Sequence, residues 1–345
     1  MSVEHDWEEQ RRHLLGHRIS DLGLRIHGTR VERLVSQLYG ELDTHGVRFK
    51  PPVYLSDQWG CPDATPLIGV PFYLADPRLE RIESEMSFGV ENDDESMRFL
   101  RHEAGHAFNY AFQLYDRVDW QAMFGAFRAP YRDRYRANPL SRDYVRHILA
   151  WYAQKHPDED FAETFAVWLT PDLNWRHAYA GWPALRKLEY VDAVMREIAD
   201  AAPTVLEPAE DDLPVEAMRY TVAEHYADSV EDIPIEDERQ FDVDLRQIFH
   251  RGADAPNAES ARVFLQRHRR EIVSRVAFWT SEQPSVVRSL IDALERRAES
   301  LQLRAGGLEA ATLIELTAFA TAVVMLYRET QVLGRARRPR VGALD

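Results

Sequence analysis

The chain has 345 residues, of which 45% are hydrophobic and 29% are charged, as expected for a globular protein with one large or two ordinary domains. Its formal net charge of −15 argues against nucleic acid or an anionic membrane as the main partner. The single cysteine, Cys61, rules out an internal disulfide, and the first residues lack the cationic start and apolar core of a secretory signal. We therefore expect a cytoplasmic protein.

The N-terminal part of the chain is expected to be helical up to about residue 50 and then to form short strands. Residues 47–79 contain short β-prone runs separated by proline, glycine and aspartate. Pro71 lies inside the last run and lacks a backbone donor, which confines that run to the edge of a sheet. We expect a small sheet with an exposed edge, at which residues 68–74 form the rim of a substrate cleft. The alternative is an edge covered by the chain's own loops.

The next segment contains His102-Glu103-Ala104-Gly105-His106, an H-E-x-x-H pattern. Acidic residues at 93–95 and apolar residues at spacings of three and four predict that the pattern lies on a helix. Residues i and i+4 share a helix face, so His102 and His106 can reach one metal ion, with Glu103 beside its open coordination position. Gly105 costs about 1 kcal/mol inside a helix relative to alanine, but a small residue there allows another segment to approach the metal face.

A catalytic zinc ion needs a third protein ligand, and the sequence offers two candidates in one later helix. Within residues 156–169, Pro157 and the acidic residues after it are typical of the first turn of a helix. Glu163 lies among apolar neighbours, where an unpaired carboxylate is costly and a metal ion would offset that cost. Glu159 lies one turn earlier on the same face. It is either a hydrogen-bond partner of a ligating histidine or the alternative ligand.

The H-E-x-x-H arrangement is that of a zinc hydrolase, which also needs a donor for the developing oxyanion. Tyr152 is the first candidate, because its phenol precedes the helix of the third ligand and can turn toward the metal. His156, in its protonated form, is the second candidate. Either side chain could instead serve only packing or helix capping.

Together, H-E-A-G-H and the later E-D-F-A-E-T-F-A resemble the gluzincin group of zinc metallopeptidases. More narrowly, residues 151–166 are similar to a bacterial family of zinc-binding metallopeptidases, and the resemblance covers roughly residues 51–191. It implies a zincin-like domain of α+β class that acts on a peptide or protein substrate. It also implies that His102, His106 and Glu163 hold Zn²⁺ and that Glu103 is the general base.

The C-terminal part shows no chemistry and is expected to be an all-α domain. We place the domain boundary at 203/204, with an acidic, proline-containing linker at the start of the second domain and three apolar-striped helices after it. The last helix has an apolar middle that we consider too short to span a bilayer, so we expect it to be the centre of a small bundle that docks a partner or self-associates. A metal-containing binding or assembly module with little or no peptidase activity is the alternative to an enzyme.

Overall fold

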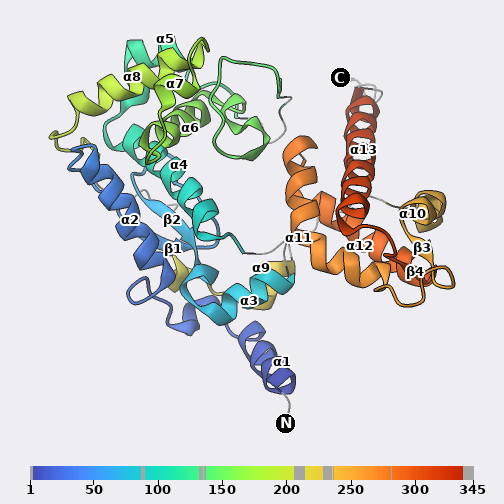
Figure 1. The fold of residues 1–345 in the computed structure, drawn as a ribbon. Coiled ribbons are helices and arrows are strands. Elements are labelled where there is room, and N and C mark those ends of the chain that lie inside the picture. The colour runs from blue at the N-terminus through green and yellow to red at the C-terminus, as the bar shows by residue number, and fades with distance from the viewer. Residues whose placement is uncertain are drawn as a thin grey trace, which may run out of the picture. The chain divides into compact units, whose positions relative to one another are not determined.

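The protein's computed structural model describes residues 3–86, 90–131, 135, 137–205, 214–227, 235, 237–280 and 282–336 (Figure 1). The chain divides into two compact units. Unit 1 comprises residues 1–85 and 90–226, and unit 2 comprises residues 86–89 and 227–345. The structure is mixed and mostly helical, which confirms the α+β class.

The elements up to residue 227 are helices, single turns of 3-10 helix and two short strands. In chain order they are α1 (Val3–Leu15), η1 (Ile19–Leu22), α2 (Arg30–Thr44), β1 (Val53–Ser56), β2 (Ile68–Pro71), η2 (Phe72–Ala75), α3 (Pro77–Met86), α4 (Asp93–Ala111), η3 (Leu114–Asp116), α5 (Val118–Phe124), η4 (Leu149–Gln154), α6 (Pro157–Leu169), α7 (Trp175–Ala178), α8 (Ala184–Glu197), η5 (Val215–Ala217) and α9 (Val222–Ala227).

The sheet of unit 1 consists of β1 and β2, which pair in parallel with Val53 opposite Ile68. The outer edge of β2 is occupied rather than exposed. Gly69 exchanges both backbone hydrogen bonds with Gly60, at 2.7 and 3.3 Å, and Pro71 has no N–H to offer. All of β2 is buried. The loop that follows β1 folds back over the strand, which is the alternative that the sequence left open. The exposed edge, on which the expected cleft rim at 68–74 depends, is therefore wrong.

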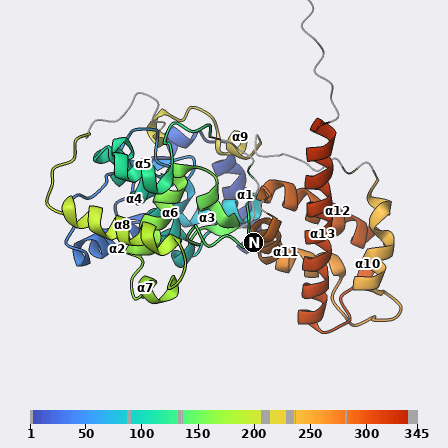
Figure 2. The same ribbon diagram turned by 90° about the horizontal axis from the view of Figure 1, so that it is seen from above.

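Local sequence signals determine where the two central helices begin. Asn92 caps α4 and forms a capping box with Glu95, in which each side chain bonds the other residue's backbone N–H. His156 caps α6, and Pro157 occupies its first turn. The two helices lie side by side in both views (Figures 1 and 2).

The close approach of α4 and α6 depends on Gly105. A Cβ atom built on Gly105 would lie 2.7 Å from the Cα atom of Ala162 and 3.0 Å from its carbonyl oxygen. Real Cβ atoms essentially never come this close to backbone atoms. The prediction that a small residue at this position lets another segment reach the metal face is confirmed.

Unit 1 continues beyond the predicted domain boundary at 203. The backbone of residues 218–222 bonds to that of residues 17–20, for example from Ile19 N to Tyr220 O at 3.1 Å. Val215, Met218 and Val222 are buried. The acidic, proline-containing composition of this region suggested a linker, but these apolar side chains attach its described middle part to unit 1. Residues 206–213 and 228–234 of the expected linker lie outside the described residues.

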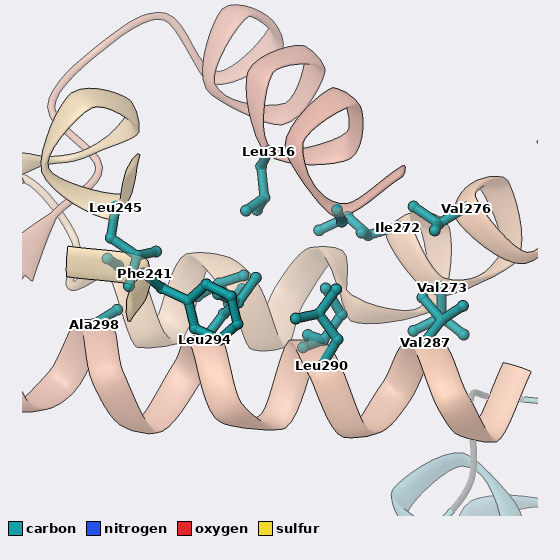
Figure 3. Close-up of a cluster of buried hydrophobic side chains, with 14 of the residues drawn as sticks. Phe241, Leu245, Ile272, Val273, Val276, Val287, Leu290, Leu294, Ala298 and Leu316 are labelled. Atoms are coloured by element: carbon teal, nitrogen blue, oxygen red, sulfur yellow. The ribbon is translucent and has the colours of Figure 1, made fainter. Parts of the chain in front are cut away.

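From residue 237 onward, the described elements of unit 2 are helices and one antiparallel pair of two-residue strands. They are η6 (Glu238–Phe241), α10 (Asp242–Ile248), β3 (His250–Arg251), α11 (Ala261–Thr280), α12 (Pro284–Ser300), β4 (Leu303–Arg304) and α13 (Glu309–Ala336). Side chains from η6, α10, α11, α12 and α13 meet in one hydrophobic core, which includes Leu245, Ile272, Leu290 and Leu316 (Figure 3).

The helix α13 is only partly the centre of this bundle. Leu316, Ala320 and Val324 are fully buried in the core, whereas Ile314 and Leu326 are 68% and 63% exposed. Residues Glu309–Arg328 are long and apolar enough to cross a membrane by length and composition, so the expectation that this helix is too short to span a bilayer is wrong. In its most apolar stretch, 22% of the residues are buried. The buried residues recur every four positions, so only one stripe of the helix contacts the core.

Candidate metal centre

The helix α4 brings the H-E-x-x-H residues into the interior of unit 1. His102, Glu103 and His106 are all buried, with exposed fractions of 2, 7 and 7%. The two imidazoles lie on one helix face, and their Nε2 atoms are 3.1 Å apart. The spacing of four residues produces this convergence, as the sequence predicted.

The helix α6 supplies a carboxylate to the same point. Oε2 of Glu159 lies 3.0 Å from Nε2 of His102 and 3.2 Å from Nε2 of His106. His102, His106 and Glu159 thus form a buried group of potential metal ligands. Tetrahedral zinc with bonds of about 2.0–2.1 Å places its ligand atoms roughly 3.3–3.4 Å apart, so the observed separations of 3.0, 3.1 and 3.2 Å need to widen by only a few tenths of an ångström to admit the ion.

Glu163, the expected third ligand, lies on the other side of His102. Its Oε1 is 2.9 Å from Nδ1 of His102, and its Oε2 accepts a 2.8 Å hydrogen bond from the backbone N–H of Ile148. Both oxygens are therefore engaged away from the point where the two Nε2 atoms meet. Glu159, the alternative from the sequence, lies where the two Nε2 atoms meet, and Glu163 is a hydrogen-bond partner of His102.

A second carboxylate lies at the outer nitrogen of His106. Oδ2 of Asp158 is 2.9 Å from Nδ1 of His106. Asp158 is itself held by 2.6 Å hydrogen bonds from Asn109 Nδ2 and from the Tyr110 hydroxyl. These bonds and the charge of His106 lower the pKa of Asp158 despite its burial, so the carboxylate stays ionised.

The carboxylates near the Nδ1 atoms of His102 and His106 determine which ligand can bind where the two Nε2 atoms and Glu159 converge. Glu163 favours a proton on Nδ1 of His102 through a hydrogen bond, and the charge of Asp158 favours one on Nδ1 of His106. Each Nε2 is then left with a lone pair directed at Glu159. Three acceptor atoms then converge within 3.2 Å in a buried space. Such a group is unstable unless a cation lies between its members. The donor set of two imidazole nitrogens and one carboxylate oxygen fits Zn²⁺.

The electrostatics of the site favour positive charge. Burial lowers the pKa of His102, but its hydrogen bonds to Glu159 and Glu163 outweigh burial and raise the pKa to about 9. The pKa of His106 is likewise raised, against burial, by Asp158 and Glu159. Burial raises the pKa of Glu159, yet both histidines together hold it well below its usual value. The site therefore attracts a cation, which can be a metal ion or a proton.

Glu103 has the properties of a proton acceptor rather than of a ligand. It follows His102 on α4 and belongs to no group of converging ligand atoms among the described residues. Burial raises its pKa, the two histidines lower it, and Glu159 and Asp158 raise it further. A raised pKa brings a carboxylate closer to the range useful for general base catalysis near neutral pH.

The two candidate oxyanion donors differ in their surroundings. The ring of Tyr152 lies beside the metal face, with its centroid 5.6 Å from that of His102. The ring of His156 is fully engaged, because Nε2 lies 2.9 Å from the carbonyl oxygen of Ala129 and Nδ1 accepts from the backbone N–H of Asp158. His156 therefore serves as the cap of α6, and of the two candidates Tyr152 is the one whose ring lies beside His102.

Besides Asp158, two residues near the site were not found from the sequence. Tyr131, from the loop after α5, donates a short hydrogen bond to Oε1 of Glu159. Lys155, at the end of η4, donates a 3.2 Å hydrogen bond to the Tyr152 hydroxyl. The only sequence signal was the mixture of aromatic and basic residues around Tyr131, and no fixed spacing links that loop to α6.

The site lies within the part of the chain that matches a described protein family. No curated protein and no solved structure is similar to the chain. Residues 91–179, which run from the start of α4 through α7, match the family described as "Putative zinc-binding metallo-peptidase".

Proposed function

We propose that the protein is a zinc-dependent peptidase of the gluzincin type, with His102, His106 and Glu159 as its metal ligands. The observation that carries the proposal is the convergence of three buried acceptor atoms, two of which belong to histidines whose outer nitrogens face carboxylates. Glu163 and Asp158 orient the two histidines. The family match over residues 91–179 supports the same activity.

Zn²⁺ bound at this site would supply a Lewis acid that polarises a peptide carbonyl and lowers the pKa of water. The protein's own residues provide the proton transfers. Glu103 takes a proton from the attacking water as the oxygen–carbon bond forms, and it delivers a proton to the leaving amine nitrogen as the carbon–nitrogen bond breaks. Tyr152 donates a hydrogen bond to the developing oxyanion. Burial raises the pKa of Glu103 above its ordinary value, which favours this role.

The test compares the wild type with Glu103→Gln, each loaded with one equivalent of zinc and incubated with a peptide library. We expect Glu103→Gln to keep wild-type zinc content and to lose turnover by at least about 100-fold, as for loss of a general base. Asp94→Asn is the matched control, because Asp94 lies on the same helix but is exposed.

Two results would contradict the proposal. Equal turnover by Glu103→Gln and the wild type would remove Glu103 from the chemistry. A zinc-loaded wild type that cleaves nothing in the library would favour the alternative, a metal-containing binding or assembly module.

A further inference from the structure

Four side chains form a continuous hydrogen-bonded chain that ends at the proposed metal ligand. Nζ of Lys155 lies 3.2 Å from the Tyr152 hydroxyl, which lies 3.4 Å from the Tyr131 hydroxyl. The Tyr131 hydroxyl donates to Oε1 of Glu159. Oε1 is the carboxylate oxygen that does not face the two histidines, which bond to Oε2.

The two end residues of this hydrogen-bonded series, Lys155 and Glu159, determine which atom donates in each hydrogen bond. A lysine ammonium has three donors and no acceptor, and an ionised carboxylate has acceptors only. Lys155 therefore donates to the Tyr152 oxygen, and Tyr131 uses its single proton on Glu159. Among the described residues, the acceptor for the Tyr152 proton is the Tyr131 hydroxyl. The two oxygens are 3.4 Å apart, so this hydrogen bond is weak. The Tyr152 proton is thus the one that can turn to a substrate at low cost.

The aromatic rings hold the ammonium of Lys155 in place. Nζ lies 4.3 Å from the centroid of the Tyr131 ring and 4.9 Å from that of Tyr152. Cation–π attraction at these distances adds to the hydrogen bond. A donor bound to the phenol oxygen also strengthens the hydrogen bond that the phenol itself donates. Lys155 thus affects both the direction and the strength of the Tyr152 donor.

We propose that Lys155 is a positioning residue, whose ammonium holds the Tyr152 hydroxyl with its proton directed at the substrate's oxyanion. Tyr131 has a different role, since it fixes the carboxylate of Glu159 and thereby supports metal binding. Both roles rest on the proposed peptidase function, but the contact between Lys155 and Tyr152 can be tested without activity.

The kinetic test is a double-mutant cycle with Lys155→Met and Tyr152→Phe. We expect Tyr152→Phe to lower kcat by about 100- to 1000-fold, as for loss of one oxyanion donor. Lys155→Met should lower kcat by about 10-fold and leave KM within about threefold, because it acts through Tyr152 rather than on substrate binding. The double variant should be no slower than Tyr152→Phe alone. Lys50→Met is the control, since Lys50 pairs with Asp43 elsewhere in unit 1.

The test without activity uses protein labelled with ¹³C at the Cζ atom of tyrosine. The Tyr152 resonance is assigned by its loss in Tyr152→Phe, and we expect it to shift in Lys155→Met. The resonance of Tyr39, whose hydroxyl bonds to the carbonyl of Pro51, should not move. Zinc affinity, measured by competition with a chelator, should stay within about threefold in Lys155→Met but fall about 10- to 100-fold in Tyr131→Phe.

Each outcome decides one part of the proposal. An unmoved Tyr152 resonance, additive losses in the double variant, or an effect of Lys155→Met on KM alone would overturn the role of Lys155. Wild-type zinc affinity in Tyr131→Phe would overturn the role of Tyr131. A shifted Tyr152 resonance in a zinc-loaded protein without turnover would retain the contact but overturn its catalytic role together with the proposed peptidase function.

Discussion

Replacement of Gly105 by alanine tests whether the approach of α4 and α6 makes the metal site. The new Cβ would lie 2.7, 3.0 and 3.2 Å from the Cα, O and C atoms of Ala162, which are backbone atoms of α6 and cannot rotate away. Ordinary contact begins at 3.4 Å, so the helices must separate by several tenths of an ångström or more. His102 and His106 lie on one helix and Glu159 on the other, so the separation widens the ligand group.

The effects on stability and on zinc binding should differ in size. Overpacking costs about 1–3 kcal/mol, while alanine gains about 1 kcal/mol over glycine in a helix. The net loss in the free energy of unfolding of the metal-free protein is therefore about 0–2 kcal/mol. Zinc affinity should fall more, by about 10- to 100-fold, because ligand atoms and their hydrogen-bond partners come from both helices.

The assays are urea unfolding of the metal-free protein and competition with a chromophoric chelator for zinc. Gly40→Ala is the matched control, since Gly40 is an exposed residue of α2 with open space around its Cβ position. It should gain up to about 1 kcal/mol and keep wild-type zinc affinity. If Gly105→Ala also kept wild-type affinity and stability, the close contact at Ala162 would not determine the site.

Two further predictions concern the buried ion pair beside the site and the core of unit 2. Burial raises the pKa of Asp160 to about 7 although Lys187, 2.6 Å away, lowers it, so its carboxyl destabilises the fold increasingly as pH rises from about 4 to 7. Lys187→Met raises that pKa further and should lower the free energy of unfolding by up to about 3–5 kcal/mol at pH 8.5. At pH 5, where Asp160 is neutral, the loss should be small. The measurement is urea unfolding with chelator present. Equal losses at both pH values would refute this explanation. Leu290→Ala, in the core of unit 2, should cost about 2–5 kcal/mol in the unfolding of that unit and leave zinc affinity unchanged. A loss of zinc affinity would contradict this prediction.

The parts of the site that follow from short-range sequence signals were predictable. The i and i+4 spacing placed His102 and His106 together, and the acidic first turns and Pro157 located the starts of α4 and α6. Gly105 indicated a close approach by another segment, and Ala162 of α6 makes that approach. These signals depend on a few neighbouring residues, so one sequence is enough to read them.

The parts that depend on the relative placement of distant segments were not predictable. Glu159 and Glu163 share a helix face one turn apart, so the sequence alone cannot decide which of them meets Nε2 of His102 and which meets Nδ1. That choice depends on how far α6 is shifted along α4. Tyr131 reaches Glu159 from a loop with no fixed spacing to it. The outer edge of β2 is covered by a loop contact at Gly60, and no local sequence pattern predicts this contact.

Zinc content of single variants tests the central claim most directly, namely that His102, His106 and Glu159 hold one metal ion. We expect the purified wild type, dialysed against a slight excess of zinc and then against buffer, to keep one zinc per chain by mass spectrometry. Glu159→Gln should keep almost none, whereas Glu163→Gln should keep the ion with about 10- to 100-fold lower affinity. Full zinc content in Glu159→Gln together with none in Glu163→Gln would assign the ligand to Glu163 instead. A wild type without zinc would contradict the metal site itself.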